Sequence, residues 1–187
     1  PEDESYTLTV SSSRITIKAG TYRGVVNGIS TLRQLLPDEI ESREPVKGIR
    51  WTVPLVQVQD KPAYHWRGLM LDPSRHFYSV EETEQFLDHM ALYKYNKFHW
   101  HLTDGVAWRL QINRYPLLTQ RGAWREFRQD IDINCENRAK AENNPTLLIP
   151  QKYCREENGR RLYGGFYTQD DVCRVVRYAA IRGIDVI

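Results

Sequence analysis

The stretch Trp66–Phe77, which reads WRGLMLDPSRHF, decides the fold prediction. Its run Gly68–Leu71 is short and continuously apolar, which predicts a strand covered on both faces, and Asp72 begins the loop that follows. Residues 97–103 (KFHWHLT) predict a second strand. Between the two strands, residues 86–91 carry an apolar stripe at helical spacing, so a helix is predicted there.

A second helix and a third strand are predicted further along the chain. Thr168, with Asp171 three positions later, resembles a capping box that opens a helix, and 184–187 begins a strand. The order strand, helix, strand, helix, strand is typical of parallel α/β units, which bind ligands at the carboxyl ends of their strands. Either a doubly wound sheet or a (β/α)8 TIM barrel fits. A barrel needs about 250 residues, so 63–187 would hold about three of its eight strands.

The N-terminal residues show a different pattern. Apolar and polar residues alternate in 6–10 and again in 15–17, which predicts a β-hairpin. Val25, Ile29, Leu32 and Leu36 predict one face of a helix that ends at Pro37, and Trp51–Gln59 is again extended. Residues 1–62 are therefore predicted to be the C-terminal part of a small α+β domain.

A long polar segment, about 104–167, separates the second strand from the second helix. Its middle holds the polar residues 134–144 and the Pro-bounded residues 145–150, and a long loop of this kind is usually functional or mobile. Cys135, Cys154 and Cys173 form no C-x-x-C pair, which argues against structural zinc. They are either three free thiols or include a Cys135–Cys154 disulfide, which would imply an oxidising compartment.

The composition excludes several classes of protein. Of the 187 residues 41% are hydrophobic and 27% are charged, as in a globular protein with a core. The net charge is +2 and the basic residues are dispersed, so no nucleic-acid partner is expected. No apolar run is long enough for a membrane span, and neither a signal peptide nor an initiator Met is present in the sequence given.

Polar residues directly after the predicted strands are the candidates for chemistry. An arginine there offers a planar fork of donors to paired hydroxyls or a carboxylate, and a neighbouring carboxylate can accept hydroxyl protons or hold the arginine. A tryptophan can stack on a sugar or pack under the loop. For each arginine the alternative is a purely structural tie. The candidates are Asp72, Ser74, Arg75, His76, Thr103, Asp104, Trp108 and Arg109.

Two histidines on the second predicted strand raise the question of a metal site. His99 and His101 are two positions apart, so they face the same side, and this spacing occurs in zinc sites. No third ligand is evident nearby. Buried, hydrogen-bonded histidines are therefore predicted and no metal is expected.

Several long motifs resemble one enzyme family. Residues 64–77 (YHWRGLMLDPSRHF) and 94–104 (KYNKFHWHLTD) resemble the first two barrel strands of glycoside hydrolase family 20 β-N-acetylhexosaminidases. Residues 163–168 (YGGFYT), 177–180 (RYAA) and 183–187 (GIDVI) resemble the approach to the third strand of these enzymes. Residues 28–36 (GISTLRQLL) resemble the helix of their non-catalytic α+β domain.

The resemblance implies roles for two residues. Arg75 would bind the 3- and 4-hydroxyls of the terminal sugar, and Asp104 would be a buried carboxylate that helps to hold the catalytic machinery. After this Asp the family usually continues Asp-Gln-Gly-Trp-Arg, whereas residues 105–109 read GVAWR here. Trp108 and Arg109 are therefore retained, while the Asp and the Gln are not.

The resemblance also implies the reaction. Family 20 enzymes are retaining glycosidases in which the substrate's own acetamido oxygen is the nucleophile, an exception to the two-carboxylate scheme. Their Asp-Glu pair follows the fourth strand, so it is expected beyond Ile187, and the isolated chain is expected to be inactive. The partner would be a glycan with terminal GlcNAc or GalNAc, no cofactor is expected, and a secreted, periplasmic or lysosomal location is favoured. The alternatives are a non-catalytic carbohydrate-recognition module or an interaction protein.

Overall fold

The computed structural model describes residues 3–187, which form two compact units. One unit contains the described residues up to Leu69, together with Thr83–His99 and Val176–Ile187. The other contains Met70–Glu82 and Trp100–Val175. No helix within 3–187 is long and apolar enough to cross a bilayer.

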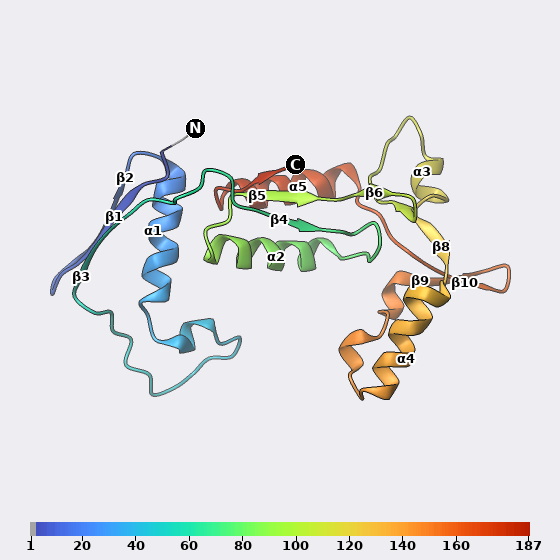
Figure 1. The fold of residues 1–187 in the computed structure, drawn as a ribbon, viewed down its shortest axis with the longest axis horizontal. Helices are drawn as coiled ribbons and strands as arrows, with labels where there is room; N and C mark the ends of the chain where they lie inside the picture. The colour runs from blue at the N-terminus through green and yellow to red at the C-terminus, as the bar shows by residue number, and fades with distance from the viewer. Residues whose placement is uncertain (1–2) are drawn as a thin grey trace. The chain divides into compact units, whose positions relative to one another are not determined.

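The N-terminal part of the first unit is an antiparallel sheet with one helix (Figure 1). Strand β1 (Tyr6–Val10) lies between β2 (Ile15–Ala19) and β3 (Val56–Asp60) and pairs with both. The β1–β2 pairing confirms the predicted hairpin. The side chains of β1 that alternate inward make the core, which contains Tyr6, Leu8 and Val10.

Helix α1 (Tyr22–Gln34) approaches this sheet through glycines. A Cβ at Gly24 would lie 2.5 Å from a backbone oxygen, and one at Gly28 would lie 2.6 Å from a side-chain carbon of β2. The helix therefore buries a face that contains both glycines. Ile29, predicted on the buried face, is 53% exposed. That part of the prediction was wrong, because the helix approaches the sheet most closely at Gly24 and Gly28 and not at Ile29.

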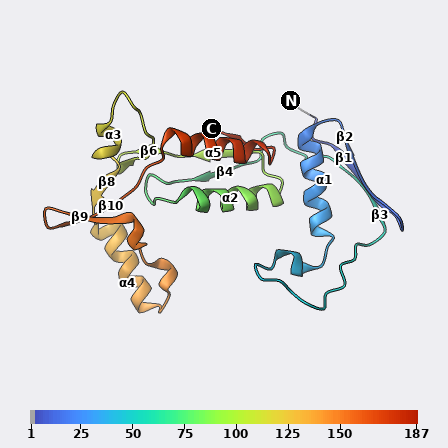
Figure 2. The same cartoon turned by 180° about the vertical axis from the view of Figure 1, so that it is seen from behind.

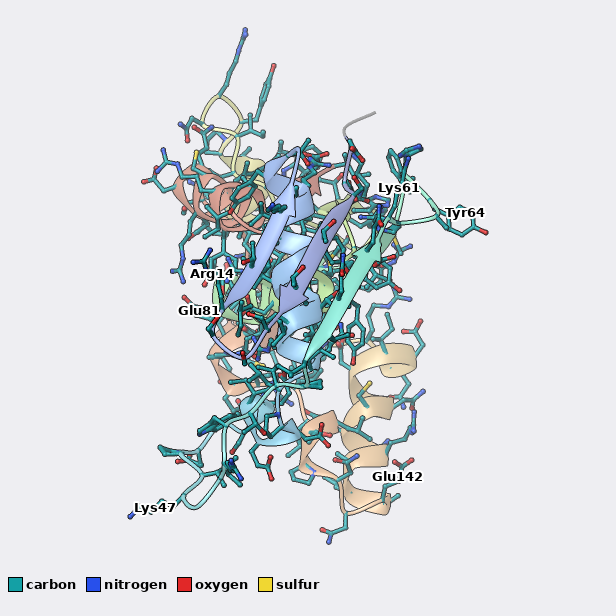
Figure 3. All side chains as sticks on the ribbon, turned by 90° about the vertical axis from the view of Figure 1, so that its left-hand side faces the viewer. Arg14, Lys47, Lys61, Tyr64, Glu81 and Glu142 are labelled. Carbon is teal, nitrogen blue, oxygen red and sulfur yellow. The ribbon has the colours of Figure 1, made fainter. Side chains whose placement is uncertain are left out.

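The chain then runs along the surface before and after β3. A short 3-10 helix, η1 (Asp38–Glu41), follows α1. Figure 3 shows Arg14 at the β1–β2 turn, and Lys61 and Tyr64 on the segment after β3, with their side chains directed outward. Tyr64 is 76% exposed.

A second sheet in this unit is parallel. Strand β5 (Lys97–Trp100) lies between β4 (Gly68–Leu71) and the short β11 (Asp185–Val186), with which it pairs in parallel. Backbone hydrogen bonds join Lys97 N to Arg67 O and His101 N to Leu71 O. The residue numbers rise together along both strands, so β4 and β5 are parallel too. The predicted α/β arrangement is confirmed.

Two helices flank these strands, α2 (Val80–Leu92) and α5 (Gln169–Ala180) (Figures 1 and 2). Phe86 of α2 packs against Phe98 of β5, with ring centroids 5.7 Å apart. Asp88 of α2 accepts hydrogen bonds from Tyr178 and Arg182, so the two helices are neighbours.

The predicted capping box opens α5. Thr168 N donates to Asp171 Oδ2 at 2.8 Å, and Asp171 N donates to Thr168 Oγ1 at 3.1 Å. An equivalent pair opens α2, where Ser79 N donates to Glu82 Oε2 at 2.6 Å and Glu82 N donates to Ser79 Oγ at 3.2 Å. Both helix starts are thus fixed by local sequence.

Strand β4 forms at the predicted residues, Gly68–Leu71. It is the edge strand of its sheet, and its burial is low along the whole length. Leu69 is 36% and Met70 is 56% exposed. The cover on both faces that the apolar run predicts is not provided within 3–187, where the strand also has a neighbouring strand on one side only.

Glu4 joins the two sheets of the first unit. Its side chain is buried, ion-pairs with Arg67, and accepts a hydrogen bond from Asn96 Nδ2 at 2.8 Å. Arg23 Nη1 lies 3.8 Å from Glu4, and its Nη2 donates to Asp185 Oδ1 at 2.6 Å. Arg67, Asn96 and Asp185 lie at the amino ends of the parallel strands.

The second unit contains the segment predicted as a long loop, and this prediction was wrong. The segment is folded into many short elements, and its middle is a three-stranded antiparallel sheet in the order β8-β10-β9 (Figure 1). The strands of the three-stranded sheet are β8 (Trp124–Glu126), β9 (Cys154–Glu157) and β10 (Arg160–Gly164). Before them, β6 (Thr103–Asp104) and β7 (Ala107–Trp108) form a separate two-stranded sheet. The helices of the same segment are α3 (Leu117–Gln120), η2 (Gln129–Ile133), α4 (Asn134–Ala141), η3 (Pro145–Leu147) and η4 (Gln151–Tyr153).

Aromatic side chains form the core of this unit. Tyr163 and Tyr167 are at most 1% exposed. The Phe77 ring lies 5.0 Å from that of Tyr167 and 5.1 Å from that of Tyr153. The inner face of the β8-β10-β9 sheet therefore packs directly beneath the loop that follows β4.

Candidate functional site

Arg75 is the centre of a polar cluster after β4 and β5, and it is anchored through one nitrogen. Its Nη1 lies 2.9 Å from Asp72 Oδ2, 2.7 Å from Asp104 Oδ2 and 3.2 Å from His101 Nε2. No acceptor within 3–187 is hydrogen-bonded to its Nε or Nη2, and the side chain is 47% exposed. The guanidinium is therefore held in place while one edge of its fork is open.

Asp104 contributes a fixed negative charge to this cluster. Its Oδ1 accepts a 2.6 Å bond from Gly105 N, and its Oδ2 lies 2.9 Å from His101 Nε2. The backbone donor of Gly105 first, and then His101 and the charge of Arg75, lower the pKa of Asp104 below its usual value. The resemblance implies a buried carboxylate, whereas within 3–187 the side chain is 34% exposed and is covered in part by Arg75 and His101.

Asp72 shapes the loop that presents Arg75. Its Oδ1 accepts a hydrogen bond from Arg75 N at 3.1 Å, while its Oδ2 binds the side chain of the same residue. Ser74 is fully buried and donates from Oγ to Ala107 O at 2.9 Å, which ties the loop to β7. Ser74 is therefore a structural residue and not an exposed nucleophile.

Arg109 supports this loop from below. Its side chain is fully buried and donates to four backbone carbonyls: Nε to Pro73 O at 2.8 Å, Nη2 to Ser74 O at 3.1 Å, and Nη1 to Ala123 O at 2.7 Å and Gly165 O at 3.0 Å. Burial lowers the pKa of Arg109 to about 10, so it stays charged at neutral pH. Of the two roles considered for a strand-end arginine, the structural tie applies here.

A second, largely covered arginine lies beside the same loop. Arg125 of β8 forms a two-point ion pair with Asp132, whose side chain is 1% exposed, and its Nη2 lies 3.4 Å from Arg75 O. Its guanidinium also lies over the ring of Tyr163, whose hydroxyl accepts a 2.6 Å bond from Phe77 N. The sequence analysis missed both Arg125 and Asp132, because they lie in the segment predicted as a loop and no motif marks them.

The remaining candidates lie outside the polar cluster or are turned away from it. Trp108 Nε1 donates to Leu110 O at 2.5 Å, and its side chain is partly buried. His76 is partly buried and contacts the rings of Tyr78 and Tyr163, and this partial burial lowers its pKa. Thr103 is exposed on β6.

The two histidines of the second strand are not both buried. His99 is exposed, so the prediction of buried histidines was wrong for it, while partly buried His101 joins the Arg75 cluster. Among the described residues, no three His, Cys, Asp or Glu side chains are grouped so that they could hold a metal ion.

The disulfide alternative is not realised. Cys135, Cys154 and Cys173 are all free thiols. Cys154 Sγ lies 3.6 Å from Pro150 O, and burial raises the pKa of this thiol. No bridge therefore pins the segment between β7 and β10, which is held by its own sheet and by the Arg125–Asp132 ion pair.

A guanidinium and two carboxylates at the carboxyl ends of parallel strands form the arrangement expected of the ligand site of an α/β enzyme. Comparison with known families identifies which one. Residues 64–187 match the catalytic domain of glycosyl hydrolase family 20, and residues 1–61 match domain 2 of that family. The chain belongs to glycosyl hydrolase family 20.

Named relatives agree with this assignment. The chain is 38% identical to a beta-hexosaminidase of Porphyromonas gingivalis, covering 100% of this chain and 20% of that protein, and 36% identical to one of Vibrio furnissii, covering 100% and 26%. It thus spans about a fifth to a quarter of these relatives.

Solved structures give the same result. The chain is 36% identical to the GH20 β-N-acetylhexosaminidase of Streptomyces coelicolor A3(2), with a TM-score of 0.73, covering 99% of this chain and 31% of that one. It is 34% identical to a GH20 exo β-N-acetylglucosaminidase of Vibrio harveyi, solved with N-acetylglucosamine, with a TM-score of 0.74 and coverage of 99% and 25%.

Proposed function

We propose that this chain provides the terminal-sugar binding part of a β-N-acetylhexosaminidase that releases terminal GlcNAc or GalNAc from glycans. The membership in family 20 and the names of the relatives support the reaction class. The observation that carries the proposal is the half-open guanidinium of Arg75, anchored at the carboxyl ends of β4 and β5.

Arg75 binds the 3- and 4-hydroxyls of the terminal sugar. Nε–H and one N–H of Nη2 point in parallel from one edge of a guanidinium, a spacing that suits two neighbouring oxygens. In Arg75 this is the edge without an acceptor among the described residues, because Asp72, His101 and Asp104 all lie at Nη1. Asp104 holds the guanidinium in place and keeps it paired with a charge at neutral pH.

The proposed mechanism is the substrate-assisted one. The acetamido oxygen attacks its own anomeric carbon, a Glu protonates the leaving oxygen, and an adjacent Asp orients the acetamido group. We place this Asp-Glu pair outside residues 1–187, and we assign β4, β5 and β11 to three of the eight strands of a (β/α)8 barrel. Residues 1–187 alone would then bind sugar without hydrolysing it.

The test compares two chromogenic substrates of the full-length protein, p-nitrophenyl β-GlcNAc and p-nitrophenyl β-glucoside. The glucoside has no acetamido group and therefore no internal nucleophile, so its hydrolysis should be slower by orders of magnitude. The first product seen by NMR should be the β-anomer. Equal rates on both substrates would refute the mechanism, and binding of GlcNAc without any hydrolysis would favour the carbohydrate-recognition module.

A further inference from the structure

The outer face of the β8-β10-β9 sheet contains a hollow of about 480 Å³ that the proposed catalytic role does not use. Side chains alternate across a strand, so Arg125 and Tyr163 face inward toward the Arg75 loop, whereas Trp124 and Leu162 face outward. The hollow is lined by Gln120, Arg121, Trp124, Glu126, Arg155, Glu157, Asn158, Arg160 and Leu162.

The charged side chains that line this hollow are three arginines and two glutamates. Arg155 donates to Glu157 at 2.8 Å and Arg160 donates to Glu126 at 2.6 Å, so each carboxylate is already paired with one arginine. Arg121 is exposed, and it forms no ion pair with any residue in the part of the chain that the structure describes. Three arginines against two glutamates leave an excess positive charge around the hollow.

One of these arginines is held flat by an aromatic ring. The Arg155 guanidinium lies over Trp124, 4.0 Å from the ring centroid. A Cβ at Gly164 would lie 2.8 Å from the same ring, so the backbone of β10 packs against it as well. Trp124 therefore serves as a support for Arg155 and offers little open surface on which a sugar could stack. What the hollow presents to a ligand is a set of donors, with one guanidinium already oriented.

We propose that this hollow binds an acidic substituent, a carboxylate or a sulfate, carried by a saccharide. The saccharide class rests on the proposed function; the preference for an anion rests on the three arginines. Planar guanidinium forks match the oxygens of both groups. The same strands are linked to the loop that presents Arg75. Arg109, which supports that loop, donates to Ala123 O just before β8 and to Gly165 O just after β10.

The test measures binding by titration calorimetry with the full-length protein carrying Arg75→Ala, so that the terminal-sugar site is weakened. The probes are a GlcNAc–glucuronic acid disaccharide, a sulfated chitobiose, neutral N,N′-diacetylchitobiose and inorganic sulfate. Either acidic sugar should bind at least tenfold more tightly than chitobiose and sulfate, and the two acidic probes show which substituent is preferred.

Further substitutions locate the site. Arg121→Ala and Arg155→Ala should each weaken binding of the acidic sugar about tenfold, the loss of one charge-assisted contact. Arg114→Ala removes an equally exposed arginine outside the hollow and should change nothing. Arg155→Lys, which keeps the charge and the fold, should behave like Arg155→Ala because a point charge lacks the fork.

Three results would overturn the proposal: equal affinity for chitobiose, equal affinity for inorganic sulfate, or unchanged affinity in Arg121→Ala and Arg155→Lys. Failure here is distinguishable from failure of the proposed function. Hydrolysis of p-nitrophenyl β-GlcNAc depends on Arg75 and should be unaffected by Arg121→Ala. Binding of the acidic sugar in the hollow should be weakened by Arg121→Ala and should persist in Arg75→Ala.

Discussion

Replacing Arg75 by alanine in the full-length enzyme should lower kcat/KM about ten- to a hundredfold. The open edge of the guanidinium can donate to two neighbouring hydroxyls, and a hydrogen bond to a charged group contributes roughly 1.5–3 kcal/mol. That loss of binding corresponds to about one to two orders of magnitude in kcat/KM. Arg75→Lys should recover little, since an ammonium cannot reproduce two parallel donors.

The effect on folding should be small. Arg75 is 47% exposed, and its partners Asp72 and Asp104 are 27% and 34% exposed. Ion pairs this open to water contribute at most about 1 kcal/mol, so the melting temperature should fall by only a few degrees. Arg114→Ala is the matched control, because it removes an exposed arginine from the same unit without touching the polar cluster.

The assay measures kcat/KM on p-nitrophenyl β-GlcNAc and the melting temperature on the same preparations. A purely structural Arg75 would give the reverse pattern, with a large drop in melting temperature and near-normal kinetics of the folded fraction. Normal kcat/KM in Arg75→Ala would refute the sugar-binding role outright.

Four further changes test other parts of the structure. Asp104→Asn should lower kcat/KM about tenfold at an unchanged melting temperature, because the guanidinium loses a charged anchor. Arg109→Ala should destabilise the protein by at least about 3 kcal/mol in a urea titration, since it leaves buried carbonyls unpaired. Gly24→Ala should cost about 1–3 kcal/mol in the same titration, because its Cβ meets a backbone oxygen at 2.5 Å. Burial lowers the pKa of His76, so the unfolded chain binds its proton first as the pH falls. Stability should therefore drop below about pH 6.5, and a His76→Gln variant, followed by melting temperature between pH 7.5 and 5.5, should lose part of that drop.

The sequence predicted those parts of the fold that local rules determine. Alternation predicted the β1–β2 hairpin, and the Thr168 and Asp171 pair predicted the start of α5. A strand-end arginine next to carboxylates predicted the cluster around Arg75. Each of these features depends on residues that are close together in the sequence or at the ends of neighbouring strands.

The segment between β7 and α5 could not be predicted in the same way. Its sheet strands have three to five residues and are rich in charge, so they show no clean period. One local signal was present, because Asn158 and Gly159 have φ values of 51° and 74° and form the tight turn between β9 and β10. The Arg125–Asp132 ion pair and the hydrogen bonds from Arg109 to backbone carbonyls form only when the chain folds. An arginine in a polar segment of the sequence does not reveal such contacts.

The junction at Glu4 has a practical consequence for handling the protein. This one side chain, near the start of the chain, satisfies Arg67 and Asn96 at the amino ends of the parallel strands, and its backbone oxygen accepts a hydrogen bond from Asn27. An expressed segment that began at Ser5 would remove one hydrogen-bond acceptor from each of Arg67, Asn96 and Asn27. Glu4 should therefore be kept when the boundaries of an expressed segment are chosen.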